Sequence, residues 1–349
     1  MQKLVSIIVL NWNGRQFLEP CLKALQAQTY QNFEVVLVDN GSQDGSVDFV
    51  RQNFGKWERL KLIELSENSG FSGGNIEGLA HSNPEATYIA TLNNDTEAEA
   101  DWLVTLVERL EAKPNEEKWA AACGPMVFTT DRQRVASAGI EIRQDGMALD
   151  RDVGRLIMAE QLEVEIFGPC AGAALYRREA LNEVGFFDPA FFAYLEDADL
   201  AWRLRLAGWQ TLYVSGAKVA HVYSGTGKQG SPFKNFQLGR NRVWIILKNM
   251  PTKLLLRYLP KILLYDLAAC FYTLLFQRDI QPLRGRLVAL SPKHLKRILG
   301  QRREIKKLCK VNINQINQWL VKPPSLWQNL KLRRTVDRLA QPHTEMAQP

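Results

Sequence analysis

The first hundred residues of the chain alternate between short apolar runs and longer amphipathic stretches. The apolar runs are nearly continuous and rich in β-branched residues, as expected of strands buried on both faces of a sheet. They occupy residues 4–10, 33–38, 60–65 and 87–92. The stretches between them, such as residues 17–28 and 45–54, place apolar side chains on one helical face. This alternation predicts an α/β fold with a mostly parallel central sheet flanked by helices.

After Pro125 the alternation of apolar runs and amphipathic stretches becomes less regular, and we interpret the next segments as the second half of the same domain. Its expected elements are a strand at residues 171–176, helices at 177–184 and 196–208, and strands near 211–221. The composition then changes again. We therefore expect two units, a domain at residues 1–238 and a helical region at residues 239–349.

Composition indicates a folded soluble protein whose positive charge is concentrated at one end. Hydrophobic residues make up 46% of the 349 positions and charged residues 23%, which allows a sizeable core. The formal net charge is +7, but residues 277–349 alone hold 16 Lys and Arg against 4 Asp and Glu. Trp319 and Trp327 of this basic tail form no pattern typical of base stacking, so we do not expect nucleic-acid binding.

Residues 254–276 form a long apolar stretch just before the basic tail. A membrane span needs ~20 mostly apolar residues, and here Arg257, Pro260, Lys261 and Asp266 interrupt the stretch. We therefore expect a helix that lies at the bilayer surface, with the downstream cations facing anionic lipid. The alternative is a buried helical hairpin packed on the main domain, because core helices have similar apolar lengths.

Cysteine usage and the N-terminus bear on the compartment. The five cysteines lie far apart with no C-x-x-C pair, so the sequence predicts neither a disulfide framework nor a zinc site, and the reduced cytoplasm is favoured. The first apolar run ends in Asn11-Trp12-Asn13-Gly14 rather than in a small-residue cleavage site, which favours a strand over a signal peptide. The expected location is cytoplasmic, peripheral at the inner face of the cell membrane.

Each of the four early strands ends in a polar loop. The loops are Asn11 to Gly14, Asp39 to Ser42, Ser66 to Gly70, and Asn93 to Asp95. Ligands of open parallel sheets sit outside the carboxyl ends of the strands, so four such loops predict a binding site. A dinucleotide-binding fold would place G-x-G-x-x-G after the first strand, where only Gly14 stands. At residues 68–75, instead, Gly70, Gly73 and Gly74 would let backbone amides approach a ligand closely.

Five motifs carry a resemblance to a known family: "SIIVLNWNG", "VVLVDNGSQDGS", "NSGFSGGN", "TLNNDT" and "FFAYLEDADLAWRLRLAGW". Their order resembles the family 2 inverting glycosyltransferases of the GT-A fold, particularly the rhamnosyltransferase-like branch. The likeness covers roughly residues 4–250, including "GRNRVWIILKNMP" at 239–251. It implies a Rossmann-like GT-A domain, with a nucleotide-sugar half at residues 1–100 and an acceptor half at 101–238, followed by a helical, basic C-terminal extension.

The resemblance also implies a reaction, a single in-line displacement with inversion at the anomeric carbon of the transferred sugar. The donor is expected to be dTDP-rhamnose, with a UDP-sugar as the second choice. The acceptor is expected to be a saccharide or a lipid-linked saccharide in polysaccharide biosynthesis. The alternative is a non-catalytic sugar-nucleotide-binding or membrane-scaffold protein on the same fold.

The donor pocket implied by the resemblance contains Asp39, Asn11, Asn68 and Gly70. The Asp39 carboxylate would accept a hydrogen bond from the N3–H of a uracil or thymine ring, because that group is a fixed donor. Asn11, Asn68 and Gly70 are expected to line the same pocket. The simpler alternative for Asp39 is an Asx turn after a strand.

Asn93 to Asp95 match the position of the family's D-x-D element. Asn93 and Asp95 are expected to contact the donor, and Asp95 to hold a divalent Mg²⁺ or Mn²⁺ ion against its diphosphate. Asn93 stands where the usual motif has an acid and can offer only an amide oxygen. His221 resembles the histidine that completes the metal shell in many GT-A enzymes. The alternatives are a turn at Asn-Asn-Asp and a structural histidine.

Glu196 and Asp197 open a predicted helix and match the family's E-D element. By resemblance Asp197 is the general base that removes the proton of the acceptor hydroxyl, and Glu196 binds the acceptor. The acceptor side is also expected to be lined by Ala171 and Gly172. Without the resemblance, acids in a first helical turn are explained by the helix dipole, and Asp199–Arg203 is expected to be an ordinary surface pair.

Overall fold

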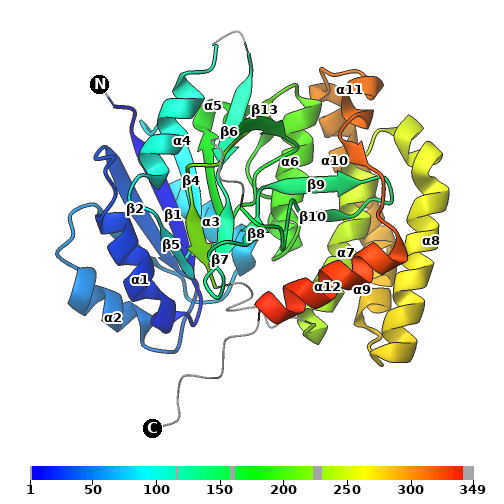
Figure 1. Cartoon of the computed structure of the whole chain (residues 1–349), viewed down its shortest axis with the longest axis horizontal. Coiled ribbons are helices and arrows are strands. Elements are labelled where there is room, and N and C mark those ends of the chain that lie inside the picture. Colours follow the sequence, from blue (N-terminus) through cyan, green and yellow to red (C-terminus); the bar gives the residue numbers. More distant parts are fainter. Residues whose placement is uncertain (1, 115–116, 158–161, 223–229, 341–349) are drawn as a thin grey trace.

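The computed structural model describes residues 2–114, 117–157, 162–222 and 230–340 (Figure 1). Its central feature is a sheet of eight strands in the order β11-β13-β6-β12-β4-β1-β2-β3. One half of this sheet consists of the strands expected from the early apolar runs, and they are all parallel. Their bounds are β1 Val5–Asn11, β2 Phe33–Asp39, β3 Leu60–Glu64 and β4 Tyr88–Asn93.

The other half of the sheet is mixed. β12 is antiparallel to both its neighbours, β4 and β6, whereas β13 is parallel to β6, and β11 is antiparallel to β13. The bounds are β6 Trp119–Cys123, β11 Glu163–Ile166, β12 Ala173–Arg177 and β13 Gln210–Val214. The expected mostly parallel central sheet is confirmed.

Helices cover both faces of this sheet because successive strand residues point to opposite sides. On β1, Ile7 and Val9 join the core formed with α1, α2 and α4, whereas Ile8 joins the core that contains side chains of α3, α5 and α6. The helix bounds are α1 Arg15–Gln26, α2 Ser46–Phe54, α3 Gly70–His81, α4 Trp102–Glu111, α5 Arg178–Val184 and α6 Glu196–Leu206. The carboxyl ends of β1, β2 and β4 therefore open between two helical layers.

Two smaller sheets extend the fold. One has the order β5-β14-β7-β8, with β5 Thr96–Ala98, β14 Val219–His221, β7 Met126–Phe128 and β8 Val135–Ser137. The other has the order β10-β9-β15, with β10 Ala148–Asp150, β9 Ile140–Arg143 and β15 Leu320–Val321. β5 directly follows Asp95, and its three residues pair with β14.

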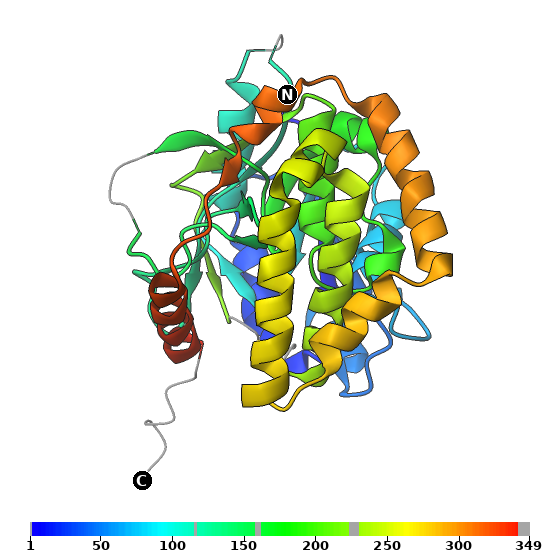
Figure 2. The same cartoon turned by 90° about the vertical axis from the view of Figure 1, so that its right-hand side faces the viewer.

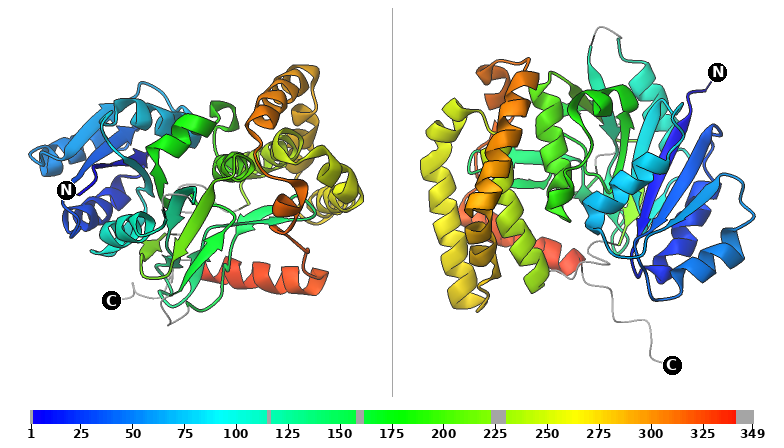
Figure 3. Two further views of the ribbon diagram at one scale, coloured as in Figure 1. Left: turned by 90° about the horizontal axis from the view of Figure 1, so that it is seen from above. Right: turned by 180° about the vertical axis from the view of Figure 1, so that it is seen from behind.

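The expected C-terminal helical region is confirmed. Figure 2 shows its helices α7 to α10 gathered on one side of the molecule, and Figure 3 shows them at the end opposite the N-terminal strands. Their buried side chains, such as Trp244 and Tyr258, form one core with Trp202 of α6. The bounds are η1 Pro189–Phe191, α7 Pro232–Asn249, α8 Thr252–Phe276, α9 Gln281–Ala289, α10 Pro292–Leu308, α11 Ile313–Asn317 and α12 Leu326–Leu339.

The expected boundary between residues 238 and 239 falls inside α7, and β15 from the tail pairs with β9 of the preceding domain. The division into two units stays a prediction. In the tail, the Trp319 ring packs under the Arg205 guanidinium at 4.2 Å. Residues 341–349 and the side chain of Trp327 lie outside the described part of the chain.

Candidate active site

The carboxyl ends of β1, β2 and β4 are joined by a chain of buried polar side chains. Asn11 and Asp39 are paired residues of neighbouring strands, and Asn11 Nδ2 donates to Asp39 Oδ1 at 2.9 Å. Asn94, which follows β4, donates from Nδ2 to Asn11 Oδ1 at 2.7 Å. The sequence alone indicated no role for Asn94. Its amide completes a row that fixes the orientation of the Asn11 side chain.

Asp39 is buried, and each of its carboxylate oxygens accepts one hydrogen bond within the protein. Besides the bond from Asn11, the backbone N–H of Ser42 donates to Oδ2 at 2.9 Å. The latter bond reaches three residues along the chain, whereas the Asx turn of the simpler alternative would reach two. Because each carboxylate oxygen has two lone pairs, both oxygens keep capacity for a further donor such as a ring N–H.

The glycine-rich loop is held by Asn40, another residue without an assigned role at the sequence level. Asn40 Nδ2 donates to Asn68 Oδ1 at 3.0 Å, and Asn40 Oδ1 accepts the backbone N–H of Ser69 at 2.9 Å. Asn68 Oδ1 also accepts the backbone N–H of Gly70 at 2.8 Å. The Asn68 side chain thus braces the loop from inside.

At two glycines of residues 68–75, close contacts within the protein leave no room for a side chain. Gly70 has φ +78°, and a Cβ there would lie 2.4 Å from the carbonyl oxygen of Phe192. A Cβ on Gly74 would lie 2.2 Å from Leu10 Cδ1 on β1. This contact explains Gly74 by the packing of α3 on the sheet, and ligand approach at this glycine stays a prediction.

Asp95 and His221, the predicted metal ligands, lie side by side. His221 Nε2 is 3.2 Å from Asp95 Oδ1, and both side chains are largely buried. The pairing of β14 with β5, directly after Asp95, brings them together, and the N–H of Val222 donates to the Asp95 carbonyl at 2.9 Å. Among the described residues no three His, Cys, Asp or Glu side chains form a metal cluster. The protein therefore offers a carboxylate and an imidazole, which suits an ion that takes its other oxygens from phosphate and water.

The backbone of Asn93 is embedded at the same edge. Its N–H donates to the carbonyl of Gly172 at 2.9 Å, and its carbonyl accepts a bond from Thr96 Oγ1 at 2.6 Å. Gly172 lies close to the side chain of Asn93, because a Cβ at Gly172 would be 3.3 Å from Asn93 Nδ2. The Ala171 side chain is buried, and its contribution to the site is its backbone N–H.

That backbone N–H orients the predicted base. Asp197 Oδ2 accepts it from Ala171 at 3.2 Å, and Oδ1 accepts the N–H of Ala198 at 2.7 Å. Asp197 lies in the first turn of α6, as the sequence indicated, where the helix dipole favours a carboxylate. Burial nevertheless raises its pKa to about 6, and the charge of Asp150 also raises it.

Glu196 has a different environment from its neighbour. Its side chain is 6% exposed, and its Oε2 atom has no hydrogen-bond partner among the described residues. Burial, followed by the charge of Asp197, raises the pKa of Glu196 well above its ordinary value. Burial thus raises the pKa of both carboxyl groups, and that of Glu196 further than that of Asp197. An unpartnered buried oxygen is also what a ligand hydroxyl could satisfy.

A third carboxylate, Asp150 at the end of β10, belongs to this site and was missed. Burial raises the pKa of Asp150, whereas a hydrogen bond with Ser137 and the charges of His221 and Lys234 lower it, and the charge of Asp150 in turn raises the pKa of Asp197. No sequence motif surrounds Asp150, which pairs with Ile140 of β9.

The loop before Glu196 has a strained backbone that α7 holds in place. Phe192, Tyr194 and Leu195 have φ values of 62°, 71° and 70°, a region that costs non-glycine residues energy. Asn241 Nδ2 lies 2.9 Å from the Ala193 carbonyl and 2.7 Å from that of Tyr194. The Phe192 carbonyl accepts a hydrogen bond from the backbone N–H of Ser72, which belongs to the glycine-rich element at the start of α3, at 3.0 Å. This loop thus connects the glycine-rich element to the two acids.

Asp199, one turn further along α6, corrects an expectation from the sequence. Its ion pair with Arg203, at 2.9 Å, is buried rather than an ordinary surface pair. Lys248 of α7 also reaches the Asp199 carboxylate at 3.0 Å, and the charges of Lys248 and Arg203 keep the pKa of Asp199 below its ordinary value despite burial. A buried ionic network therefore lies directly behind the site and fixes α6 against α7.

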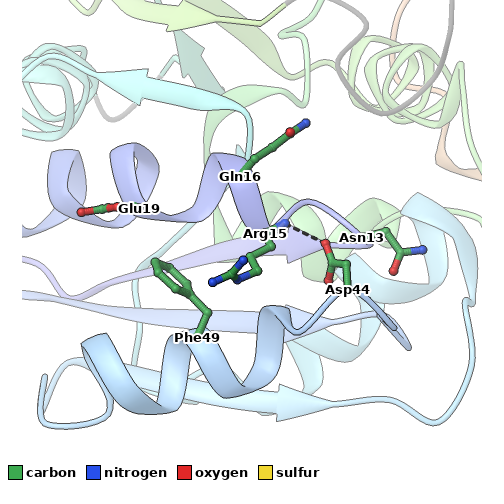
Figure 4. Close-up of a pocket in the computed structure, with 6 residues that line it drawn as sticks. All are labelled: Asn13, Arg15, Gln16, Glu19, Asp44 and Phe49. Atoms are coloured by element: carbon green, nitrogen blue, oxygen red, sulfur yellow. Dashed lines mark hydrogen bonds between the residues drawn. The ribbon is translucent and has the colours of Figure 1, made fainter.

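An open hollow of about 480 Å³ lies beside the site, between α1 and α2 (Figure 4). Its lining includes Arg15, whose N–H donates to Asp44 Oδ2 at 2.9 Å, and the ring of Phe49. None of the predicted site residues lines this hollow, although Asn13, which does, belongs to the loop after β1.

Comparison with known proteins gives a family from the sequence and an architecture from the fold. The sequence profile of Glycosyl transferase family 2 matches residues 6–185, more than half of the chain. An N-acetylglucosaminyl-diphospho-decaprenol L-rhamnosyltransferase of Mycobacterium tuberculosis is 26% identical over 247 residues, covering 63% of this chain and 76% of that protein. Glycosyltransferase AglE of Haloferax volcanii is 32% identical over 101 residues, covering 28% of this chain and 33% of that protein.

Two solved structures resemble the fold. GalNAc-T7 with UDP, GalNAc and Mn²⁺ superposes with a TM-score of 0.57 and 16% identity, over 70% of this chain and 48% of that chain. A mannosyltransferase from Pyrobaculum calidifontis in complex with GDP-Man and Mn²⁺ superposes with a TM-score of 0.51 and 18% identity, over 88% of this chain and 86% of that chain. At such low identities the likeness concerns the architecture alone.

Proposed function

The chain belongs to Glycosyl transferase family 2, and we propose that it is an inverting, nucleotide-sugar-dependent glycosyltransferase with Asp197 as its general base. The observation that carries this proposal is the difference between the two adjacent carboxyl groups at the start of α6. Asp197 has a pKa of about 6, low enough to be ionised at neutral pH yet high enough to accept a proton. Glu196, whose pKa burial raises further, suits hydrogen bonding to the acceptor.

In the proposed reaction the acceptor hydroxyl lies against Asp197 Oδ1 or Oδ2. As the hydroxyl oxygen attacks the anomeric carbon, Asp197 takes its proton, and the bond from that carbon to the diphosphate breaks on the opposite face. The N–H groups of Ala171 and Ala198 hold the carboxylate in one orientation, which reduces the entropy that the step must lose. A single displacement of this kind inverts the anomeric configuration.

The donor would occupy the strand ends of β1, β2 and β4. Asp39 retains the lone pairs that a pyrimidine N3–H needs, and Asn11 holds its orientation. Asp95 and His221 would hold a divalent cation, Mg²⁺ or Mn²⁺, at the diphosphate. When bound there, such an ion would offset the negative charge of the leaving group. Mn²⁺ in both structural relatives supports this part of the proposal.

For the donor sugar we propose L-rhamnose from dTDP-rhamnose, with a UDP-sugar as the second choice. The relative from Mycobacterium tuberculosis, by its name, transfers L-rhamnose to an N-acetylglucosaminyl-diphospho-lipid. A lipid-linked saccharide in polysaccharide biosynthesis is therefore the acceptor we favour. All five cysteines are free, which is in keeping with the reducing cytoplasm where nucleotide sugars are made.

A second candidate function is sugar-nucleotide binding without transfer. Asn93, an amide where the family's motif has an acid, is the observation that favours it, because the metal pair then has one carboxylate fewer. One experiment separates the two candidates: the purified protein is offered a panel of dTDP-, UDP- and GDP-sugars, with and without Mn²⁺. Release of free nucleoside diphosphate, accelerated by an acceptor, supports the transferase. If the protein binds nucleotides but releases no nucleoside diphosphate, with or without Mn²⁺, the result supports sugar-nucleotide binding without transfer.

A further inference from the structure

The outward face of α8 exposes a continuous apolar stripe. Its members are Leu256, Leu263, Leu264, Leu267, Phe271 and Leu274, and we refer to them as the α8 stripe. The side chains of Leu264, Leu267 and Phe271 are 71%, 70% and 63% exposed. The spacing of the six residues places them on one side of the helix over most of its length. Monomeric soluble proteins rarely leave so extended an apolar surface uncovered, so it indicates a partner.

The opposite face of α8 is fixed to the protein. Leu254, Tyr258 and Ile262 are buried, and the Tyr258 hydroxyl donates to Asn317 Oδ1 at 2.7 Å. Asp266, which interrupts the apolar sequence, lies near this face and accepts bonds at 2.9 Å from two arginines, Arg242 and Arg286. By length and composition alone α8 could cross a membrane. A helix with a buried ion pair and an aromatic core contact on one side cannot, however, be surrounded by lipid.

Cations flank the stripe. Exposed Lys253 and Arg257 lie toward the N-terminal end of α8, and exposed Arg278 and Arg284 follow its C-terminal end. The acids between residues 252 and 290 are already bonded: Asp266 to its two arginines, and Asp279 to Asn235 Nδ2 at 2.7 Å. Six Lys and Arg stand against these two acids between residues 252 and 290, so the surface around the stripe carries net positive charge.

We propose that the α8 stripe is a docking surface for an anionic lipid bilayer, into which it inserts while lying parallel to the membrane plane. Apolar side chains would enter the boundary between headgroups and acyl chains, and the flanking cations would meet anionic headgroups. A second copy of the chain is a poorer partner, because a two-fold contact would bring identical cations together without acids to oppose them. This inference is independent of the proposed catalytic function, since it rests on no residue of the site.

Flotation of the full-length protein with vesicles tests the proposal. Phosphatidylcholine vesicles, with or without phosphatidylglycerol, serve as probes at low and high salt. The wild type should float with the phosphatidylglycerol vesicles at low salt. The double variant Leu264→Gln/Phe271→Gln should lose at least ~10-fold in apparent partitioning, because two anchoring side chains become polar. Both positions are exposed, so its thermal midpoint should match that of the wild type.

Leu156→Gln/Phe233→Gln is the matched control, because it makes the same changes at residues that are 60% and 50% exposed outside α8. It should float like the wild type. A wild type that stays in solution with anionic vesicles, or a stripe variant that floats as well as the control, would overturn the proposal. A dimer in sedimentation velocity that the stripe variant dissociates, without any flotation of the wild type, would assign the stripe to a second copy instead. Resistance to carbonate extraction would overturn surface docking in favour of a span.

The charge requirement has its own variant pair. Arg257→Gln/Arg278→Gln should weaken flotation with phosphatidylglycerol vesicles several-fold and make the remainder less sensitive to salt, because surface attraction is screened by ions. Lys3→Gln/Lys56→Gln removes two exposed cations from the N-terminal half and should change neither quantity. Equal effects of the two pairs would show that net charge alone, and not this face, governs the interaction, and would refute the proposed surface.

Discussion

His221 Nε2 lies 3.2 Å from Asp95 Oδ1, although the two residues are far apart in the sequence. The contact depends on the pairing of β14 with β5, the strand that directly follows Asp95. A carboxylate and an imidazole at this separation can bind one divalent ion together once the hydrogen bond between them is given up.

The first prediction concerns metal affinity. His221→Ala should weaken Mn²⁺ binding in the presence of dTDP by at least ~10-fold, since half of the protein's ligand set is lost. Isothermal titration measures this without any turnover. His81→Ala, at an exposed histidine on α3, should leave the affinity unchanged. Equal Mn²⁺ affinity in His221→Ala and the wild type would remove His221 from the metal site.

The second prediction separates the two acids of α6. Asp197→Asn retains the size of the side chain but cannot take a proton, so kcat should fall by roughly 10²–10⁴-fold while donor affinity stays near that of the wild type. Glu196→Gln should mainly raise KM for the acceptor. Steady-state kinetics with both substrates varied is the measurement. If Glu196→Gln abolishes turnover and Asp197→Asn stays within a few-fold of the wild type, the two roles are exchanged.

The third prediction concerns stability and pH. The folded-state pKa of Asp197, about 6, exceeds the ordinary value of 3.8, so between these values the folded protein binds a proton that the unfolded chain has lost. Stability contributed by this group is present below pH 3.8 and is lost as the pH rises to about 6. Asp197→Asn should therefore raise the thermal midpoint at pH 7.5 and converge on the wild type near pH 4. A lower midpoint of the variant at pH 7.5 would contradict this environment for Asp197.

The fourth prediction concerns base recognition. Asp39→Asn should lower the affinity for UDP and dTDP by at least ~10-fold, because one acceptor oxygen becomes an N–H donor facing another donor. Affinity for CDP, whose ring N3 is an acceptor, should rise relative to UDP. Titration calorimetry with the three nucleotides measures both changes. Asp48→Asn, on the surface of α2, serves as the control, and an unaltered UDP affinity in Asp39→Asn would take this residue out of the pocket.

The fifth prediction concerns the loop that precedes the two acids. Asn241→Ala removes the donor shared by the carbonyls of Ala193 and Tyr194, so the base should become less well positioned: kcat should fall while donor affinity is retained. Asn241→Asp preserves the shape of the side chain but places hydrogen-bond acceptors against the same carbonyls. Its kcat should therefore be no higher than that of Asn241→Ala. Asn235→Ala, on the same helix, is the control. Loss of donor binding together with kcat would indicate general unfolding rather than positioning.

Much of the fold could be predicted from the sequence, because the apolar pattern of each strand reflects its burial in the sheet. β1, β2 and β4 are covered on both faces, so their sequences are continuously apolar, and the polar residues after them stand out. The order of motifs then located Asp39, Asp95 and Asp197, which the structure places at the ends of β2 and β4 and at the start of α6.

The residues that were missed have no local signature. Asp150 is the last residue of an ordinary strand, β10, and no motif marks it; its electrostatic effect on Asp197 depends on how the chain folds, with β10 paired to β9. Asn241 lies within a helix, and its role depends on the carbonyls of a loop far away in the sequence. The burial of Asp199 was not predicted, because the i,i+4 spacing of an ion pair is the same on a surface helix and on a buried one. Only the packing of α7 against α6 makes it buried.

The pairing of Leu320 with Ile142 makes the end of the chain part of the same small sheet as Asp150. The C-terminal region is thus not an appendage that recombination could exchange at residue 239. A chimera that imports the tail of a related enzyme would have to import β9 and β10 with it, or leave an unmatched sheet edge beside the reaction centre. In evolutionary terms, the strand that carries Asp150 and the end of the chain that pairs with the same small sheet are expected to be inherited together.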